Sequence, residues 1–150
     1  MKVTSSIDLP CPIDEAWTVL TRWERQADWM ADADRVDVLG DVTAGVGVRV
    51  AVRTRLFHVP AFTETIEVVG WEPPRRLEIV HGTPVAGRGT WSLEPIEAGT
   101  RFTWTEQAAL EIPLVGSFAA AVYAPVARWL IGRSQRALRA LIVASGPSRD

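Results

Sequence analysis

The sequence predicts an α+β domain in which one curved antiparallel sheet packs against a long C-terminal helix. Apolar and polar residues alternate through most of the chain, which is the pattern of strands with one buried face. Turn signals separate these stretches at short intervals, as in antiparallel sheets. Residues 113–144 predict a single helix, about 45 Å long from the rise of an α-helix. Such a helix must cross the whole domain, because the radius of gyration expected for 150 residues is about 15 Å.

The chain begins with a strand and two short helices. Residues 3–9 alternate and predict the first strand, which a proline-rich turn ends. An acidic pair then begins a helix over residues 14–20, because negative charge stabilises the N-terminus of a helix. A second short helix is expected over residues 22–29.

Six further strands are expected before the long helix. They cover residues 34–39, 46–53, 62–68, 77–81, 87–94 and 102–110. In the second of these, we expect Val46, Val48, Val50 and Val52 to share the buried face. The proline pair at residues 73 and 74 separates two strands, because proline cannot continue a hydrogen-bond ladder.

Composition limits the classes of function. We expect residues 1–146 to form one domain and residues 147–150 a flexible tail. With 16 basic and 18 acidic residues the net charge is −2, so we expect no nucleic-acid partner. The chain has two histidines and one cysteine, and we expect no metal site and no cofactor. We see no signal peptide and no apolar run long enough to span a membrane, so a cytoplasmic protein without stable membrane insertion is expected.

Three polar residues interrupt the apolar faces of the predicted strands: Glu64, His81 and Glu106. An unpaired buried carboxylate costs several kcal/mol, so each carboxylate must be paired, neutral or facing a wet cavity. We expect the proline hairpin to pair Trp71 with Arg76. That register puts His81 opposite a neighbour of Glu64, Ile66, and within reach of the Glu64 side chain. The pair is either an acid–base dyad or a structural pair that lines a ligand cavity.

The next hairpin predicts two cross-strand pairs on the inward face. Trp91 lies opposite Trp104, and Gly89 lies opposite Glu106. Gly87 and Gly89 leave inward space that either admits a ligand or lets the helix approach. The two tryptophans either stack on an aromatic ligand or pack in the core.

The long helix contributes Phe118, Val122 and the single tyrosine, Tyr123, whose hydroxyl suits a ligand carbonyl or a backbone partner. Almost every position of residues 114–126 is apolar. Either this segment is buried on all sides, or part of it is exposed at the mouth of a cavity. In the second case it contacts a membrane, a partner protein or a second copy.

Four segments of the chain carry a family resemblance. They are Pro12–Thr21 with Trp29 after it, Gly45–Gly47, Trp71–Leu77 and Gly99–Trp104. These segments, in this order along the chain, resemble those of the START-like helix-grip (SRPBCC) superfamily. Within it, the sequence is most similar to the polyketide cyclase/dehydrase and lipid-transport proteins. The resemblance implies a helix-grip fold, with a curved seven-stranded antiparallel sheet around the long helix. It also implies a deep cavity that binds a hydrophobic small molecule such as a lipid, a polyketide or a quinone.

Three functions stay open. The favoured one is non-enzymatic binding or transport of a hydrophobic or aromatic small molecule, which requires a cavity of about 300 Å³ or more. The expected ligand contacts are Phe62, Ile66, Gly87, Gly89, Trp91, Trp104, Glu106, Phe118, Val122 and Tyr123. The second is a polyketide cyclase, aromatase or dehydrase with Glu64 and His81 as catalytic residues. The third is a quinone or lipid chaperone that contacts a membrane or a protein through residues 114–126.

Overall fold

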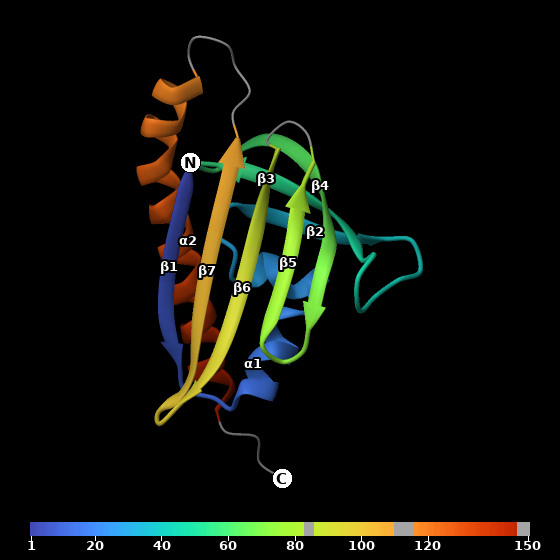
Figure 1. Ribbon diagram of the computed structural model, residues 1–150, viewed down its shortest axis with the longest axis vertical. Helices are drawn as coiled ribbons and strands as arrows, with labels where there is room; N and C mark the ends of the chain where they lie inside the picture. The colour runs from blue at the N-terminus through green and yellow to red at the C-terminus, as the bar shows by residue number, and fades with distance from the viewer. Residues whose placement is uncertain (83–85, 110–115, 147–150) are drawn as a thin grey trace.

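A computed structural model of the chain describes residues 1–82, 86–109 and 116–146. Over these residues the chain forms one seven-stranded sheet, two α-helices and one 3-10 helix, as expected (Figure 1). In chain order the elements are β1 (Lys2–Leu9), α1 (Ile13–Leu20), η1 (Trp23–Asp28), β2 (Ala33–Leu39), β3 (Arg49–Leu56), β4 (Val59–Glu72), β5 (Arg76–His81), β6 (Ala86–Ile96), β7 (Gly99–Ala109) and α2 (Gly116–Ser145). The expected helix start at residue 113 and the expected tail at residues 147–150 lie outside the described residues.

The sheet has the strand order β1-β7-β6-β5-β4-β3-β2, and every neighbouring pair is antiparallel. Helix α2 packs against β1 and β7, while η1 packs against β2. Figure 1 shows α2 running beside β1 along the length of the sheet. The helix therefore closes the side of the sheet on which the apolar side chains of the strands gather. In the described part of the chain, no helix combines the length and hydrophobicity needed to cross a membrane.

Aromatic side chains fill a large part of the space under the helix. The Trp91 ring lies 5.5 Å from the Trp104 ring, 5.9 Å from Phe102 and 5.8 Å from Trp29, measured between centroids. All four side chains are buried. Each ring of this size buries about 150–250 Å², so this cluster is a major source of hydrophobic stabilisation.

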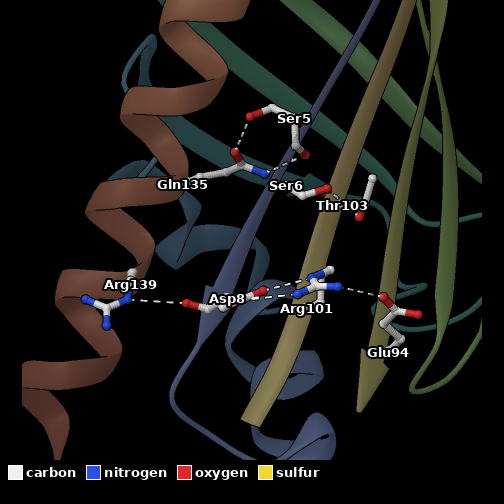
Figure 2. A network of polar contacts seen from close by, with 8 residues as sticks. All are labelled: Ser5, Ser6, Asp8, Glu94, Arg101, Thr103, Gln135 and Arg139. Atoms are coloured by element: carbon white, nitrogen blue, oxygen red, sulfur yellow. Dashed lines mark hydrogen bonds and ion pairs between the residues drawn. The ribbon is translucent and has the colours of Figure 1, made fainter. Parts of the chain in front are cut away.

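Helix α2 is also attached to the sheet by polar contacts (Figure 2). The side chain of Gln135 is buried and accepts a hydrogen bond of 2.7 Å from Ser5 Oγ. Its Nε2 donates to the Ser5 carbonyl oxygen at 2.9 Å. One turn further, Arg139 donates to the Asp8 carbonyl oxygen at 3.3 Å, at the exposed end of the same strand. These contacts set the rotation of α2 about its axis, and so decide which of its residues face the sheet.

The expectation for Val46 was wrong. Val46 is 64% exposed and lies before β3, whereas Val48, Val50 and Val52 are buried. The backbone at Gly45 and Gly47 has positive φ angles of 91° and 97°. These angles belong to a turn, so the strand begins after the second glycine.

The proline hairpin has a different register from the one predicted. Trp71 pairs with Leu77 and not with Arg76. A bulge between Val68 and Gly70 removes this one-residue offset, because a bulge places an extra residue on one strand. Beyond the bulge, Ile66 pairs with His81 as predicted. The bulge therefore keeps His81 on the inward face.

Candidate functional site

A cavity of about 170 Å³ lies between the sheet and helix α2. Among the described residues, its polar lining consists of Gln26, Asp32, Thr54, Glu64, His81, Glu106, Tyr123 and Ser134. The requirement of about 300 Å³ or more is not met, because the tryptophan side chains occupy much of the space under the helix. That limit applies to drug-sized ligands, and smaller molecules bind in smaller cavities. A cavity of about 150 Å³ holds benzene, so this one has room for a single aromatic ring.

His81 lies between two carboxylates inside this cavity. Its Nδ1 is 3.2 Å from Glu64 Oε2, and its Nε2 is 3.0 Å from Glu106 Oε2. The second Glu106 oxygen, Oε1, accepts a hydrogen bond of 2.7 Å from Trp104 Nε1. The side chains of Glu64, His81 and Glu106, which we call the Glu–His–Glu cluster, are between 13% and 17% exposed. Solvent therefore does little to screen their charges.

The sheet brings the cluster together from three strands. Glu64 on β4 is diagonal to His81 on β5, as the predicted register requires. Glu106 lies on β7, two strand spacings or about 10 Å from β5. Between them, on β6, Gly89 pairs directly with Glu106. Because Gly89 has no side chain, the Glu106 side chain can extend over β6 to His81.

The geometry determines the protonation of His81. Each ring nitrogen faces a carboxyl oxygen, and only the imidazolium form can donate an N–H to both at once. Burial alone lowers the pKa of His81. The hydrogen bonds to Glu106 and Glu64 and the charges of both carboxylates outweigh burial and raise the pKa to about 10. At neutral pH His81 is thus a largely buried cation that lies between two carboxyl groups.

Asp32 is a cavity residue that the sequence analysis did not identify. It lies in the loop between η1 and β2, where its carbonyl oxygen accepts a hydrogen bond of 2.8 Å from the Arg55 backbone N–H. Burial raises the pKa of the Asp32 carboxyl, and the negative charges of Glu64 and Glu106 raise it further. No periodic pattern marks a residue in a loop, so nothing in the sequence indicated that Asp32 faces inward.

Of the three residues of α2 that were expected to contact the ligand, only one lines the cavity. Tyr123 lines it, and burial together with the charge of Asp32 raises the pKa of its hydroxyl. Phe118 and Val122 do not line it, since they are 72% and 56% exposed. Their expected placement was wrong, because one step along a helix turns the side chain by about 100°. The described part of the 114–126 segment is thus partly exposed, as in the second alternative.

The remaining predicted contacts divide into two groups. Phe62, Ile66, Gly87, Trp91 and Trp104 line the cavity. Gly89 does not, and the expectation that it leaves empty space was wrong. A Cβ atom at this position would lie 2.9 Å from both Glu106 Oε1 and Ile79 Cγ1, so neighbouring side chains already occupy that space.

The donor set of the cavity does not form a metal centre. In residues 1–82, 86–109 and 116–146, no three His, Cys, Asp or Glu side chains are grouped as metal ligands. Both ring nitrogens of His81 are already taken up by carboxylates, so neither lone pair is free for a cation. The chemistry that this arrangement offers is hydrogen bonding and proton exchange.

A second group of aromatic residues lies outside the cavity. Phe57, at the tip of the β3–β4 hairpin, is 74% exposed and stacks on Trp129 of α2 with ring centroids 6.4 Å apart. The Arg133 guanidinium lies 5.3 Å from the centre of the Trp129 ring. Both Phe57 and its neighbour His58 have positive φ, at 49° and 68°. No pattern in the sequence indicated this exposed aromatic contact.

Comparison with protein families gives one match. Residues 1–144 match the family described as polyketide cyclase/dehydrase and lipid transport. The match covers all of the described strands and nearly all of α2. No curated protein sequence matches the chain.

Several solved structures share the fold. TTHA0849 from Thermus thermophilus is 16% identical with a TM-score of 0.80, covering 98% of this chain and 100% of that one. The di-domain ARO/CYC StfQ from the steffimycin biosynthetic pathway is 13% identical with a TM-score of 0.77, covering 96% and 51%. The di-domain ARO/CYC BexL from the BE-7585A biosynthetic pathway is 16% identical with a TM-score of 0.73, covering 100% and 51%. At these identities the likeness establishes the fold alone.

Proposed function

The chain belongs to the polyketide cyclase/dehydrase and lipid transport family, and from this premise we propose that it binds a small aromatic molecule in the cavity under α2. Membership of this family supports a role in hydrophobic ligand binding or cyclisation. The observation that carries the proposal is the cavity itself, in which apolar walls surround a few convergent polar groups. This is the usual composition of a small-molecule site.

The size of the cavity narrows the ligand. A volume of about 170 Å³ accommodates one aromatic ring. Trp91, Trp104 and Phe62 supply flat apolar surfaces on which a ring can pack. Widening the cavity itself would require α2 to move away from the sheet, which the Gln135 contacts to β1 oppose.

Native mass spectrometry of the freshly purified protein, followed by denaturing extraction, tests this function first. A small excess mass that is lost on denaturation supports it. Binding is then located by NMR titration with benzyl alcohol, in which amide shifts should cluster around the cavity. Ala127→Leu fills the cavity and should abolish these shifts, whereas Ala140→Leu on the exposed side of the same helix should keep them. An apo mass together with no cavity shifts would overturn the proposal.

Acid–base catalysis, as in a cyclase or dehydrase, is the second candidate. The Glu–His–Glu cluster and Tyr123 favour it, because they place exchangeable protons inside a cavity. The raised pKa of His81 argues for binding instead, since an acid with a pKa of about 10 is poorly matched to neutral pH. A turnover that survives both His81→Gln and Glu64→Gln would exclude this role for the cluster.

Contact with a membrane or a partner protein is the third candidate. It is favoured by the exposed apolar side chains of Phe57, Phe118 and Val122. Liposome flotation of the wild type against Val122→Asp tests the membrane version. Equal flotation of the two proteins would exclude it.

A further inference from the structure

The cavity is unusual in the charge of its lining. Asp32, Glu64 and Glu106 contribute three carboxyl groups, and among the described lining residues the one cationic side chain is His81. The Met1 ammonium also lies at the cavity, but it donates to the Ala108 carbonyl oxygen at 3.0 Å and has no carboxylate of the described residues within 4.0 Å. The carboxyl groups therefore outnumber the cation that they hold.

We propose that the ligand of this cavity carries a positively charged nitrogen, joined to a single aromatic ring by a short aliphatic linker, so that the protein binds small arylalkylamines as ammonium ions. This inference rests on the proposed function and names the class of its ligand. Four observations support it: the excess of carboxyl groups, their free acceptor atoms, the position of Asp32 and the aromatic walls.

Hydrogen-bond acceptors remain free in the cavity after the internal contacts are counted. Glu106 uses both oxygens, one for His81 and one for Trp104, whereas Glu64 uses only Oε2. Within the described residues, Glu64 Oε1 has no side-chain partner, and the Asp32 carboxyl accepts a backbone hydrogen bond but none from a side chain. An ammonium group has three N–H donors and no acceptor, so it matches this surplus.

Asp32 explains why a cation fits better than a neutral donor. Asp32 lines the same cavity as Glu64 and Glu106, whose negative charges raise the pKa of its carboxyl, whereas the charge of His81 lowers it. A buried carboxylate beside two others is unfavourable, and a cation placed among them favours the charged form of all three. A carboxylate ligand would add a fourth negative charge to the same space.

The aromatic walls provide for the rest of the ligand. Trp91 and Trp104 line the cavity beside the carboxyl groups, and the face of a tryptophan ring also attracts a nearby cation. The volume admits one ring, and a short linker then brings the nitrogen to the carboxyl oxygens. The ring and the ammonium group thus have complementary partners in one cavity.

The test compares three probes of nearly equal size: benzylamine, benzyl alcohol and benzoate. Isothermal titration at pH 7 should show benzylamine binding at least tenfold more tightly than benzyl alcohol, with no binding of benzoate. NMR titration should place the benzylamine shifts around the cavity. Asp32→Asn should reduce the ratio of amine to alcohol affinity by at least fivefold. Asp41→Asn, in the exposed β2–β3 loop, is the matched control and should keep the ratio.

The outcomes separate the two proposals. If benzyl alcohol binds in the cavity as tightly as benzylamine, or benzoate binds more tightly, the charge inference is overturned and the binding function stands. If no probe binds, both are overturned. Should Asp32→Asn fail to fold, Glu64→Gln serves as the second variant, because its free oxygen faces the same space. An unchanged ratio in the folded variant contradicts the inference.

Discussion

Gly89 lies directly opposite Glu106 in the β6–β7 ladder, and a Cβ atom at position 89 would come within 2.9 Å of Glu106 Oε1. The missing side chain is therefore a structural requirement of the site. It leaves the path along which the Glu106 side chain crosses β6 to reach His81. A glycine on the inward face of a strand is costly for the strand, and here it gives a carboxylate access to the imidazole.

Gly89→Ala should displace the Glu106 carboxylate from His81 and from Trp104. We expect a loss of about 1–3 kcal/mol in the free energy of unfolding from overpacking, measured by urea denaturation. NMR titration of the His81 ring should show a lower pKa than in the wild type. Gly132→Ala in α2 is the control, because its Cβ would meet only the end of the Arg136 side chain, at 3.3 Å. That variant should be as stable as the wild type or more so. A wild-type His81 pKa in Gly89→Ala would contradict this account of Gly89.

The raised pKa of His81 predicts a specific dependence of stability on pH. Its pKa is about 10 in the folded protein and about 6.5 in the unfolded chain. The stabilisation is fully present below pH 6.5 and is lost as the pH rises through 10, because the folded state then loses its extra proton. The stability advantage of the wild type over His81→Gln should shrink across this range. His58→Gln, at the exposed hairpin tip, is the control for the loss of a histidine. Its free energy of unfolding should fall with rising pH as that of the wild type does. If the difference in the free energy of unfolding between the wild type and His81→Gln is constant from pH 6 to 10, His81 is not held as an imidazolium.

Asp32 should lower the stability of the ligand-free protein at neutral pH. Its folded pKa is raised above the unfolded value of 3.8, so stability declines as the pH rises from 3.8 through the folded pKa. Asp32→Asn should therefore have a larger free energy of unfolding than the wild type at pH 7. The gain should vanish below pH 3.8, where Asp32 is protonated in both states. Asp41→Asn is again the matched control. If Asp32→Asn is less stable than the wild type at pH 7, the folded protein stabilises the Asp32 carboxylate, and the prediction is wrong.

Gln135→Ala tests how strongly α2 is attached to β1. The substitution removes both hydrogen bonds to Ser5 and leaves the half-buried Ser5 carbonyl oxygen without its partner on α2. We expect a loss of about 2 kcal/mol in the free energy of unfolding, measured by urea denaturation. Gln107→Ala, on the exposed face of β7, should change stability by less than about 0.5 kcal/mol. Equal effects of the two variants would show that packing alone holds the helix.

Alternation by itself determined the strands and their inward faces. Because successive side chains on a strand point to opposite faces, the sequence alone placed Glu64, His81 and Glu106 on the apolar side of the sheet. The predicted pairing of Trp91 with Trp104 and of Ile66 with His81 is confirmed. Ile66 pairs with His81 although the hairpin between β4 and β5 was predicted one residue out of register. The β4 bulge absorbs the difference, and a bulge leaves no mark in the alternation of the residues that flank it.

Only the tertiary structure decided what meets inside the cavity. Asp32 comes from a loop, and its position follows from contacts with β3 that no local pattern encodes. Tyr123 faces inward and Val122 outward in a part of α2 where nearly every residue is apolar, so the local sequence marks no inward side. The Gln135 contacts to β1 and the buried Ile131 and Leu138 determine which side of the helix faces the sheet. The volume likewise depends on how the tryptophan rings pack together. Local sequence determines the period of each element, but the depth, charge and size of a site arise from contacts between elements far apart in the chain.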